Sequence, residues 1–175
     1  MKYLVGALGA VTVLALAAVA FIYSGIFNVS AKEPEASITT WALRTTMEQG
    51  VQRRASQASV PTQFSAVQVR AGARAFGHEC AICHGAPGVP REAWAKSMNP
   101  MPPDLAKAAP RWSPAELHWI IRNGVKMSGM PAMSDHHSDE ELWSIVAFVK
   151  ALPQMTPATF QALAPNQSDA AGHDH

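Results

Sequence analysis

Cysteine, aromatic residues and net charge are all scarce in this chain of 175 residues. Two cysteines exclude a scaffold held by several disulfides, and the length allows one domain of ordinary size. Lys and Arg number 14 against 13 Asp and Glu, and the basic residues are scattered, which argues against nucleic acid as a partner. Alternating polar and apolar residues, the pattern of a half-buried strand, are missing too. The missing strand pattern indicates an all-α protein, and 13 prolines indicate many turns between its helices.

A long apolar block stands at the N-terminus, from Leu4 to Tyr23, behind a single Lys2. A helix of this length, at about 1.5 Å per residue, can cross a hydrocarbon layer of about 30 Å. Residues 1–31 are therefore predicted to be a membrane anchor. A cleavable signal sequence is the alternative, because Val29-Ser30-Ala31 offers the small residues that a signal peptidase accepts. Under either interpretation the rest of the chain is exported.

Three further segments are predicted from changes in pattern. Residues 32–66 are expected to form a spacer, with one amphipathic helix carrying Leu43, Met47 and Val51 on one face, followed by an extended linker. Residues 67–155 are expected to be the main domain. Residues 156–175 are expected to be a flexible tail, because their end is polar and rich in small residues.

Within the main domain, the sequence predicts helices separated by an irregular stretch. Residues 69–79 form a helical pattern, whereas six prolines between residues 85 and 110 exclude a regular helix or a central strand there. Ser113 and Ser138 are each followed three residues later by glutamate, which is the capping-box pattern that opens a helix. Pro153 is expected to end the last helix.

The strongest chemical signal is the C-x-x-C-H sequence formed by Cys80, Cys83 and His84. It offers two thiols for covalent attachment of a haem and an imidazole for its iron. Three other uses are weighed against this one. A redox dithiol places its cysteines at the start of a helix, a zinc site needs four ligands, and a plain disulfide leaves His84 without a role. Haem attachment is therefore the favoured interpretation.

Residues from about 67 to 153 resemble the class I monohaem c-type cytochromes, and the anchor makes the chain similar to the small membrane-tethered bacterial members. The resemblance implies three to four helices around one covalent haem c. It implies that the first helix ends in the C-x-x-C-H sequence and crosses the last helix. Gly72 and Phe76 match the family's glycine and aromatic residue on the first helix, and Trp143 or Phe148 would face them.

The resemblance also implies a methionine as the sixth iron ligand. Met130 is the preferred candidate, because it lies in a Gly-Met-Pro sequence between two predicted helices, as in the family. Met101 and Met133 are alternatives among the methionines. His136 and His137 would give a second imidazole instead. Among the sequence's other histidines, His173 and His175 in the tail are weaker candidates for a second metal.

An iron with six protein and haem ligands has no open position for substrate, so the expected function is transfer of single electrons without catalysis. The expected partners are other redox proteins, such as a dehydrogenase, an oxidase or a small copper protein, and the membrane through the N-terminal helix. The haem domain is expected in the periplasm, on the outer face of the cytoplasmic membrane. Two alternatives stay open: a haem sensor or peroxidase-like catalyst with a labile sixth ligand, and a fixed subunit of a respiratory complex.

Overall fold

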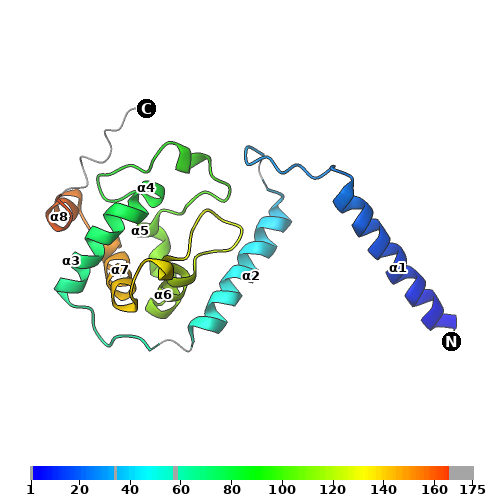
Figure 1. Cartoon of the computed structure of the whole chain (residues 1–175), viewed down its shortest axis with the longest axis horizontal. Coiled ribbons are helices and arrows are strands. Elements are labelled where there is room, and N and C mark those ends of the chain that lie inside the picture. The colour runs from blue at the N-terminus through cyan, green and yellow to red at the C-terminus, as the bar shows by residue number, and fades with distance from the viewer. Residues whose placement is uncertain (1, 34, 57–58, 166–175) are drawn as a thin grey trace. The chain divides into compact units, whose positions relative to one another are not determined.

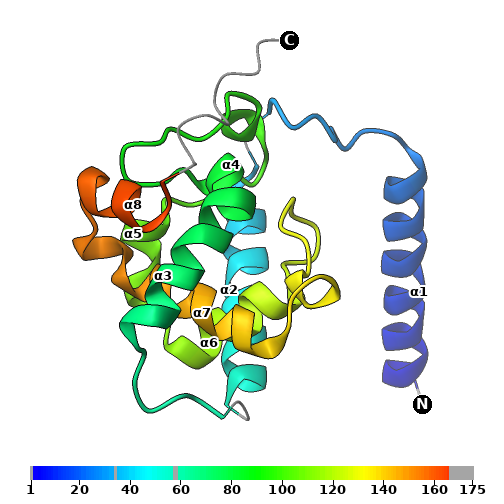
Figure 2. The ribbon, with the colours of Figure 1, turned by 60° about the vertical axis from the view of Figure 1, so that its left-hand side comes forward.

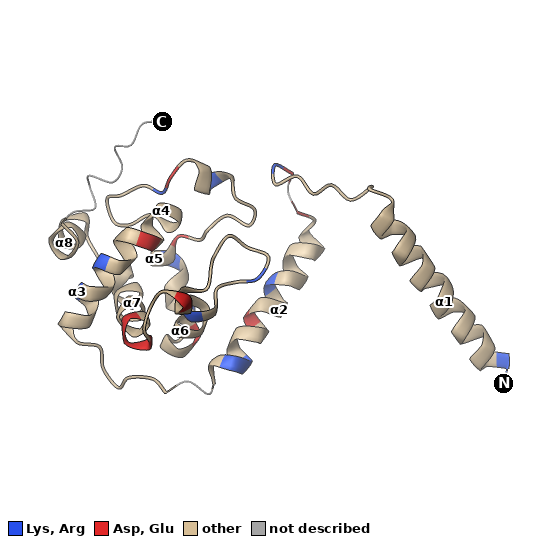
Figure 3. Ribbon diagram, in the orientation of Figure 1, with Lys and Arg blue, Asp and Glu red and all other residues tan. Residues whose placement is uncertain are grey.

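The computed structural model describes residues 2–33, 35–56 and 59–165 of the chain. It divides into two compact units, with the boundary between residues 34 and 35 (Figure 1). The first unit contains helix α1, Lys2–Tyr23, in which an 18-residue window has a mean hydropathy of 2.5. Lys2 is its one charged residue (Figure 3). The helix is long and apolar enough to cross a membrane, a property that a signal sequence near the N-terminus shares.

The second unit is helical, and its described residues contain no strand, which confirms the all-α prediction. Its α-helices are α2 (Ser37–Ala55), α3 (Ala66–Ala75), α4 (Ala81–His84), α5 (Leu105–Ala108), α6 (Pro114–Asn123), α7 (Asp139–Ala151) and α8 (Pro157–Leu163). A π-helical turn, Phe76–Cys80, joins α3 to α4, so the first helix runs on to the end of the C-x-x-C-H sequence. Short 3-10 turns lie at Trp94–Ser97, Ala109–Arg111, Met133–Asp135 and Leu152–Gln154.

The helix starts follow the local signals in the sequence. Both predicted capping boxes are formed: Ser113 caps α6 and Ser138 caps α7, each exchanging hydrogen bonds with the glutamate three residues on. Pro114 occupies the first turn of α6, where its missing N–H is not needed. These caps fix where the two helices begin, and the Ser138 cap thereby sets the end of the loop between them.

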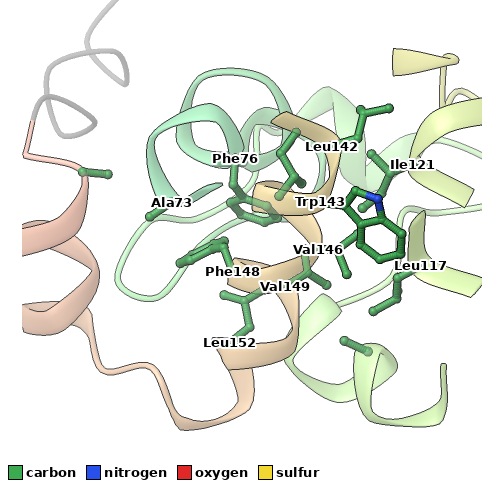
Figure 4. Packing of buried hydrophobic residues seen from close by; sticks show 14 of the residues in the cluster. Ala73, Phe76, Leu117, Ile121, Leu142, Trp143, Val146, Phe148, Val149 and Leu152 are labelled. Atoms are coloured by element: carbon green, nitrogen blue, oxygen red, sulfur yellow. The ribbon is translucent and has the colours of Figure 1, made fainter. Parts of the chain in front are cut away.

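The core is centred on the crossing of α3 and α7 (Figure 4). At this crossing a Cβ atom on Gly72 would lie 1.9 Å from the carbonyl oxygen of Ser144, so the two backbones approach as closely as glycine allows. The rings of Phe76 and Phe148 lie 5.0 Å apart at an interplanar angle of 54°. The predicted role of Gly72 is confirmed, and Phe148 rather than Trp143 is the aromatic partner of Phe76.

The prediction of a flexible tail from residue 156 is wrong over its first part. Thr156 caps α8, and Phe160 is 1% exposed, with its ring 5.7 Å from that of Phe148. The local signal was present, since Thr156-Pro157 is a cap followed by a first-turn proline. Residues 166–175, with His173 and His175, lie outside the described residues.

The predicted spacer also differs from the structure, because α2 belongs to the same unit as the haem-motif helices. Its C-terminal half packs against α6, with Val51 and Ala55 buried (Figure 2). Leu43, expected on the same face as Val51, is 55% exposed. The helix is therefore confirmed, but the expected continuous apolar face is not, because only residues in the second half of the helix are buried.

Candidate haem-binding site

The first helix brings the two cysteines and the histidine of the motif together. Cys80 ends the π-helical turn, and Cys83 and His84 lie one turn further on in α4. Both cysteines are free thiols. The wider π-helical turn shifts the direction in which the following residues project, and such turns occur frequently at functional sites. The three groups are therefore placed on one short stretch of helix at the edge of the core.

Both thiols are held in the protonated form. Burial, together with the nearby charges of Glu79 and Cys83, raises the pKa of Cys80 to about 12. Burial also raises the pKa of Cys83, partly opposed by the positive charge of Arg91. A redox dithiol needs a thiolate with a lowered pKa, and this environment has the opposite effect. The thiols fit thioether formation, in which each S–H adds across a vinyl group of the haem.

The imidazole of His84 is oriented by the proline-rich stretch that follows it. Its Nδ1 lies 2.9 Å from the carbonyl oxygen of Pro103, which can only accept, so Nδ1 carries the proton. Nε2 is left as the ring nitrogen with a free lone pair. Burial lowers the pKa of His84, the bond to Pro103 opposes this, and the charge of Arg91 lowers it further. A neutral imidazole with Nε2 free and Nδ1 bonded to a carbonyl fits the needs of an iron ligand.

Arg91 holds the same stretch in place, a role that could not be predicted from the sequence. Its guanidinium donates from Nη1 to the carbonyl oxygen of Pro102 and from Nη2 to that of His84, the latter at 3.4 Å. Arg91 therefore ties the backbone of the histidine to the backbone that precedes Pro103. This explains how a segment with so many prolines acquires a fixed conformation without regular secondary structure.

Met130 lies in the loop after α6, and contacts between residues of this loop hold its conformation. Gly124 ends the helix with φ 65°, and a Cβ atom there would lie 2.6 Å from the carbonyl carbon of Pro131. The amide of Val125 donates to the carbonyl oxygen of Met130 at 3.2 Å, and the amide of Met130 donates to Ser128 Oγ at 3.2 Å. The Met130 side chain is half-buried and packs against the core.

The other candidate ligands have different surroundings. Met101 is 58% exposed, while Met133 begins a 3-10 turn and packs against the core. His136 is exposed. His137 places its Nε2 2.7 Å from Glu79 Oε2, so this ring is engaged by a carboxylate. The assignment of Met130 as sixth ligand stays a prediction that these surroundings favour.

Residues 67–149 match a family model described as Cytochrome C oxidase, cbb3-type, subunit III. No curated protein and no solved structure matches the chain. The matched segment begins in α3, contains the C-x-x-C-H sequence and the Met130 loop, and ends in α7; α2 and α8 lie outside it. Taken with the free thiols and the oriented imidazole, the match shows that residues 67–149 are a c-type cytochrome domain, which binds haem c covalently and carries electrons.

Proposed function

We propose that this chain carries single electrons on one covalent haem c and has no catalytic activity of its own. A haem held by Cys80, Cys83 and His84 would supply one-electron redox chemistry. The observation that carries the proposal is the 2.9 Å contact between His84 Nδ1 and Pro103 O, beside the free thiols of Cys80 and Cys83. It leaves Nε2 as the ligand atom and fixes the ring before any metal binds.

In this proposal His84 and Met130 would hold the haem iron. Pro103 orients the imidazole, and the closed loop around Ser128 holds the methionine against the core. Two ligands held by rigid backbone restrict the movement that accompanies a change of oxidation state. A thioether ligand also raises the reduction potential relative to a second imidazole. Both effects suit a carrier that accepts and releases electrons without other chemistry.

The haem domain is proposed to lie on the periplasmic side of the membrane, tethered by α1. The length and hydropathy of α1 support an anchor. The resemblance to the class I c-type cytochromes implies that the haem is attached after export. A tether keeps the carrier near redox partners in or at the same membrane. The partner classes that fit are a dehydrogenase as donor, and an oxidase or a small copper protein as acceptor.

A second candidate function is that of a fixed subunit in an oxidase complex. The description of the matching family, subunit III of an oxidase, favours it. The exposed side chains of Ile38 and Trp41, at 68% and 63%, would then be available for contact with another subunit. Purification in mild detergent separates the two functions. A fixed subunit keeps its partners through the columns, whereas a free carrier elutes alone.

The carrier function is tested with the full chain in mild detergent, after co-expression with haem-attachment machinery. A potentiometric titration is expected to show one wave with the slope of a one-electron couple. The ferrous protein is expected not to bind carbon monoxide, because both axial positions are taken. Rapid binding of carbon monoxide by the wild-type protein would contradict the carrier and favour a sensor or catalyst.

A further inference from the structure

We propose that His137 is a positioning residue that latches the Met130 loop to the haem-attachment helix through Glu79. The proposal rests on the ligation of iron by Met130 proposed above. The Met130 loop is defined here as residues 124–137. The latch keeps Met130 on the iron by holding the far end of this loop to the helix that carries Cys80.

The contact joins parts of the chain that are 58 residues apart. His137 Nε2 lies 2.7 Å from Oε2 of Glu79, and its Nδ1 lies 3.8 Å from Oε2 of Glu141. Glu79 belongs to the π-helical turn and directly precedes Cys80, while Glu141 belongs to the first turn of α7. One imidazole therefore connects the haem-attachment helix, the Met130 loop and the last helix.

The environment makes this contact stronger than an ordinary surface ion pair. The side chain of His137 is 11% exposed and that of Glu79 is 39% exposed, so water screens their interaction less than between two fully exposed side chains. Glu141 is itself held by the amide of Ser138, at 2.8 Å from its Oε2. The titratable groups that face the imidazole are these two carboxylates. An ionised carboxylate can only accept, so the imidazole donates to Glu79 from Nε2, and the charge of the acceptor strengthens this hydrogen bond.

The two ends of the Met130 loop are anchored in different ways. At the α6 end, Gly124 lies directly against the backbone of Pro131. At the α7 end, the amide of His137 donates to the carbonyl oxygen of Met133 at 3.0 Å, which closes the turn Met133–Asp135. The His137 side chain then attaches this turn to the first helix. Loss of the latch would free the second end of the loop while the first remains fixed.

The test measures how easily an external ligand displaces Met130 from ferric iron. The full-length holoprotein in mild detergent is titrated with cyanide at fixed pH, and binding is followed by its optical spectrum. Cyanide can bind only when Met130 has left, so its apparent affinity scales with the open fraction of the loop. His137→Ala is expected to raise that affinity about tenfold, which corresponds to about 1.4 kcal/mol.

Three further variants make the result specific. Glu79→Ala is expected to raise the cyanide affinity by the same factor, and the double variant to raise it no further than either single change. His137→Gln, which keeps an N–H donor, should fall between the wild type and His137→Ala. The matched control is His136→Gln, on the exposed neighbour in the same loop, which should bind cyanide like the wild type.

The outcomes separate this proposal from the one on which it rests. A cyanide affinity of His137→Ala within twofold of the wild type would overturn the latch, and so would additive effects of the two single changes. In either case an intact methionine-to-iron band in the wild type leaves Met130 ligation standing. If the wild type lacks that band and Met130→Ala does not alter the spectrum, Met130 ligation fails and the latch fails with it.

Discussion

Replacing Gly72 with alanine would place a methyl group in the crossing of α3 and α7. The added Cβ would lie 1.9 Å from the carbonyl oxygen of Ser144 and 2.5 Å from its carbonyl carbon. Both are backbone atoms in the middle of α7, so no side chain can turn aside to make room. The helices would have to separate by roughly 1 Å or more, which loosens the contact between Phe76 and Phe148 next to the crossing.

The expected cost follows from two opposing effects. Overpacking a core costs about 1–3 kcal/mol, and a backbone-to-backbone clash belongs at the upper end of that range. Alanine in a helix interior recovers about 1 kcal/mol relative to glycine. Gly72→Ala is therefore expected to lower the free energy of unfolding by about 2 kcal/mol, or roughly 30-fold in the folding equilibrium.

Gly50→Ala is the matched control, because Gly50 also lies inside a helix. There the added Cβ would meet only Nη1 of the Arg54 side chain, at 3.4 Å. This variant is expected to be stabilised by up to about 1 kcal/mol through helix propensity. Guanidinium unfolding of the holoprotein in mild detergent measures both. Equal stabilisation of the two variants would refute the close crossing of α3 and α7.

Three further substitutions test other parts of the structure. Ser138→Ala removes the cap of α7 and should lower the free energy of unfolding by about 1 kcal/mol. Ser134→Ala, at an exposed position, should leave it almost unchanged. Equal unfolding midpoints of the two variants would contradict the role of Ser138 as a cap. Phe160→Ala should lower the free energy of unfolding by about 3–5 kcal/mol, because the Phe160 ring is buried against Phe148. A loss below about 1 kcal/mol would show that α8 does not pack against the core. Burial lowers the pKa of His118 below its ordinary 6.5 in the folded protein. As the pH falls, His118 is therefore protonated in the unfolded chain before it is protonated in the folded one. The wild type should therefore lose stability as the pH falls below about 6.5, and the slope of unfolding free energy against pH should flatten in His118→Phe; an unchanged slope would exclude His118 as its source.

Features encoded by neighbouring residues could be predicted from the sequence. The capping boxes at Ser113 and Ser138 and the C-x-x-C-H sequence each depend on residues within about one helical turn. The role of Gly72 was predictable only through the family resemblance, because the clash that requires it involves Ser144, far away in the chain. Features that depend on neighbouring residues could therefore be predicted from the sequence directly. A packing contact between distant residues could be predicted only where the family resemblance indicated it.

Features formed by distant residues could not be predicted. Docking of α8 depends on Phe160 meeting Phe148, and its short helix would be marginal without that contact. The pairing of His137 with Glu79 spans 58 residues, and a histidine next to a helix cap gives no sign of it in the sequence. The role of Arg91 could not be predicted either, because its hydrogen bonds go to backbone oxygens that come within reach only when the proline-rich stretch is folded.

The central claim, that His84 and Met130 hold the iron of a covalent haem, is tested most directly by the optical spectrum of the ferric protein. The full chain, co-expressed with haem-attachment machinery, should show a low-spin haem that stays with the polypeptide under denaturing conditions. It should also show a sulfur-to-iron charge-transfer band that disappears in Met130→Ala and persists in Met101→Ala. A band that survives in Met130→Ala, or a high-spin wild type, would contradict the assignment of Met130.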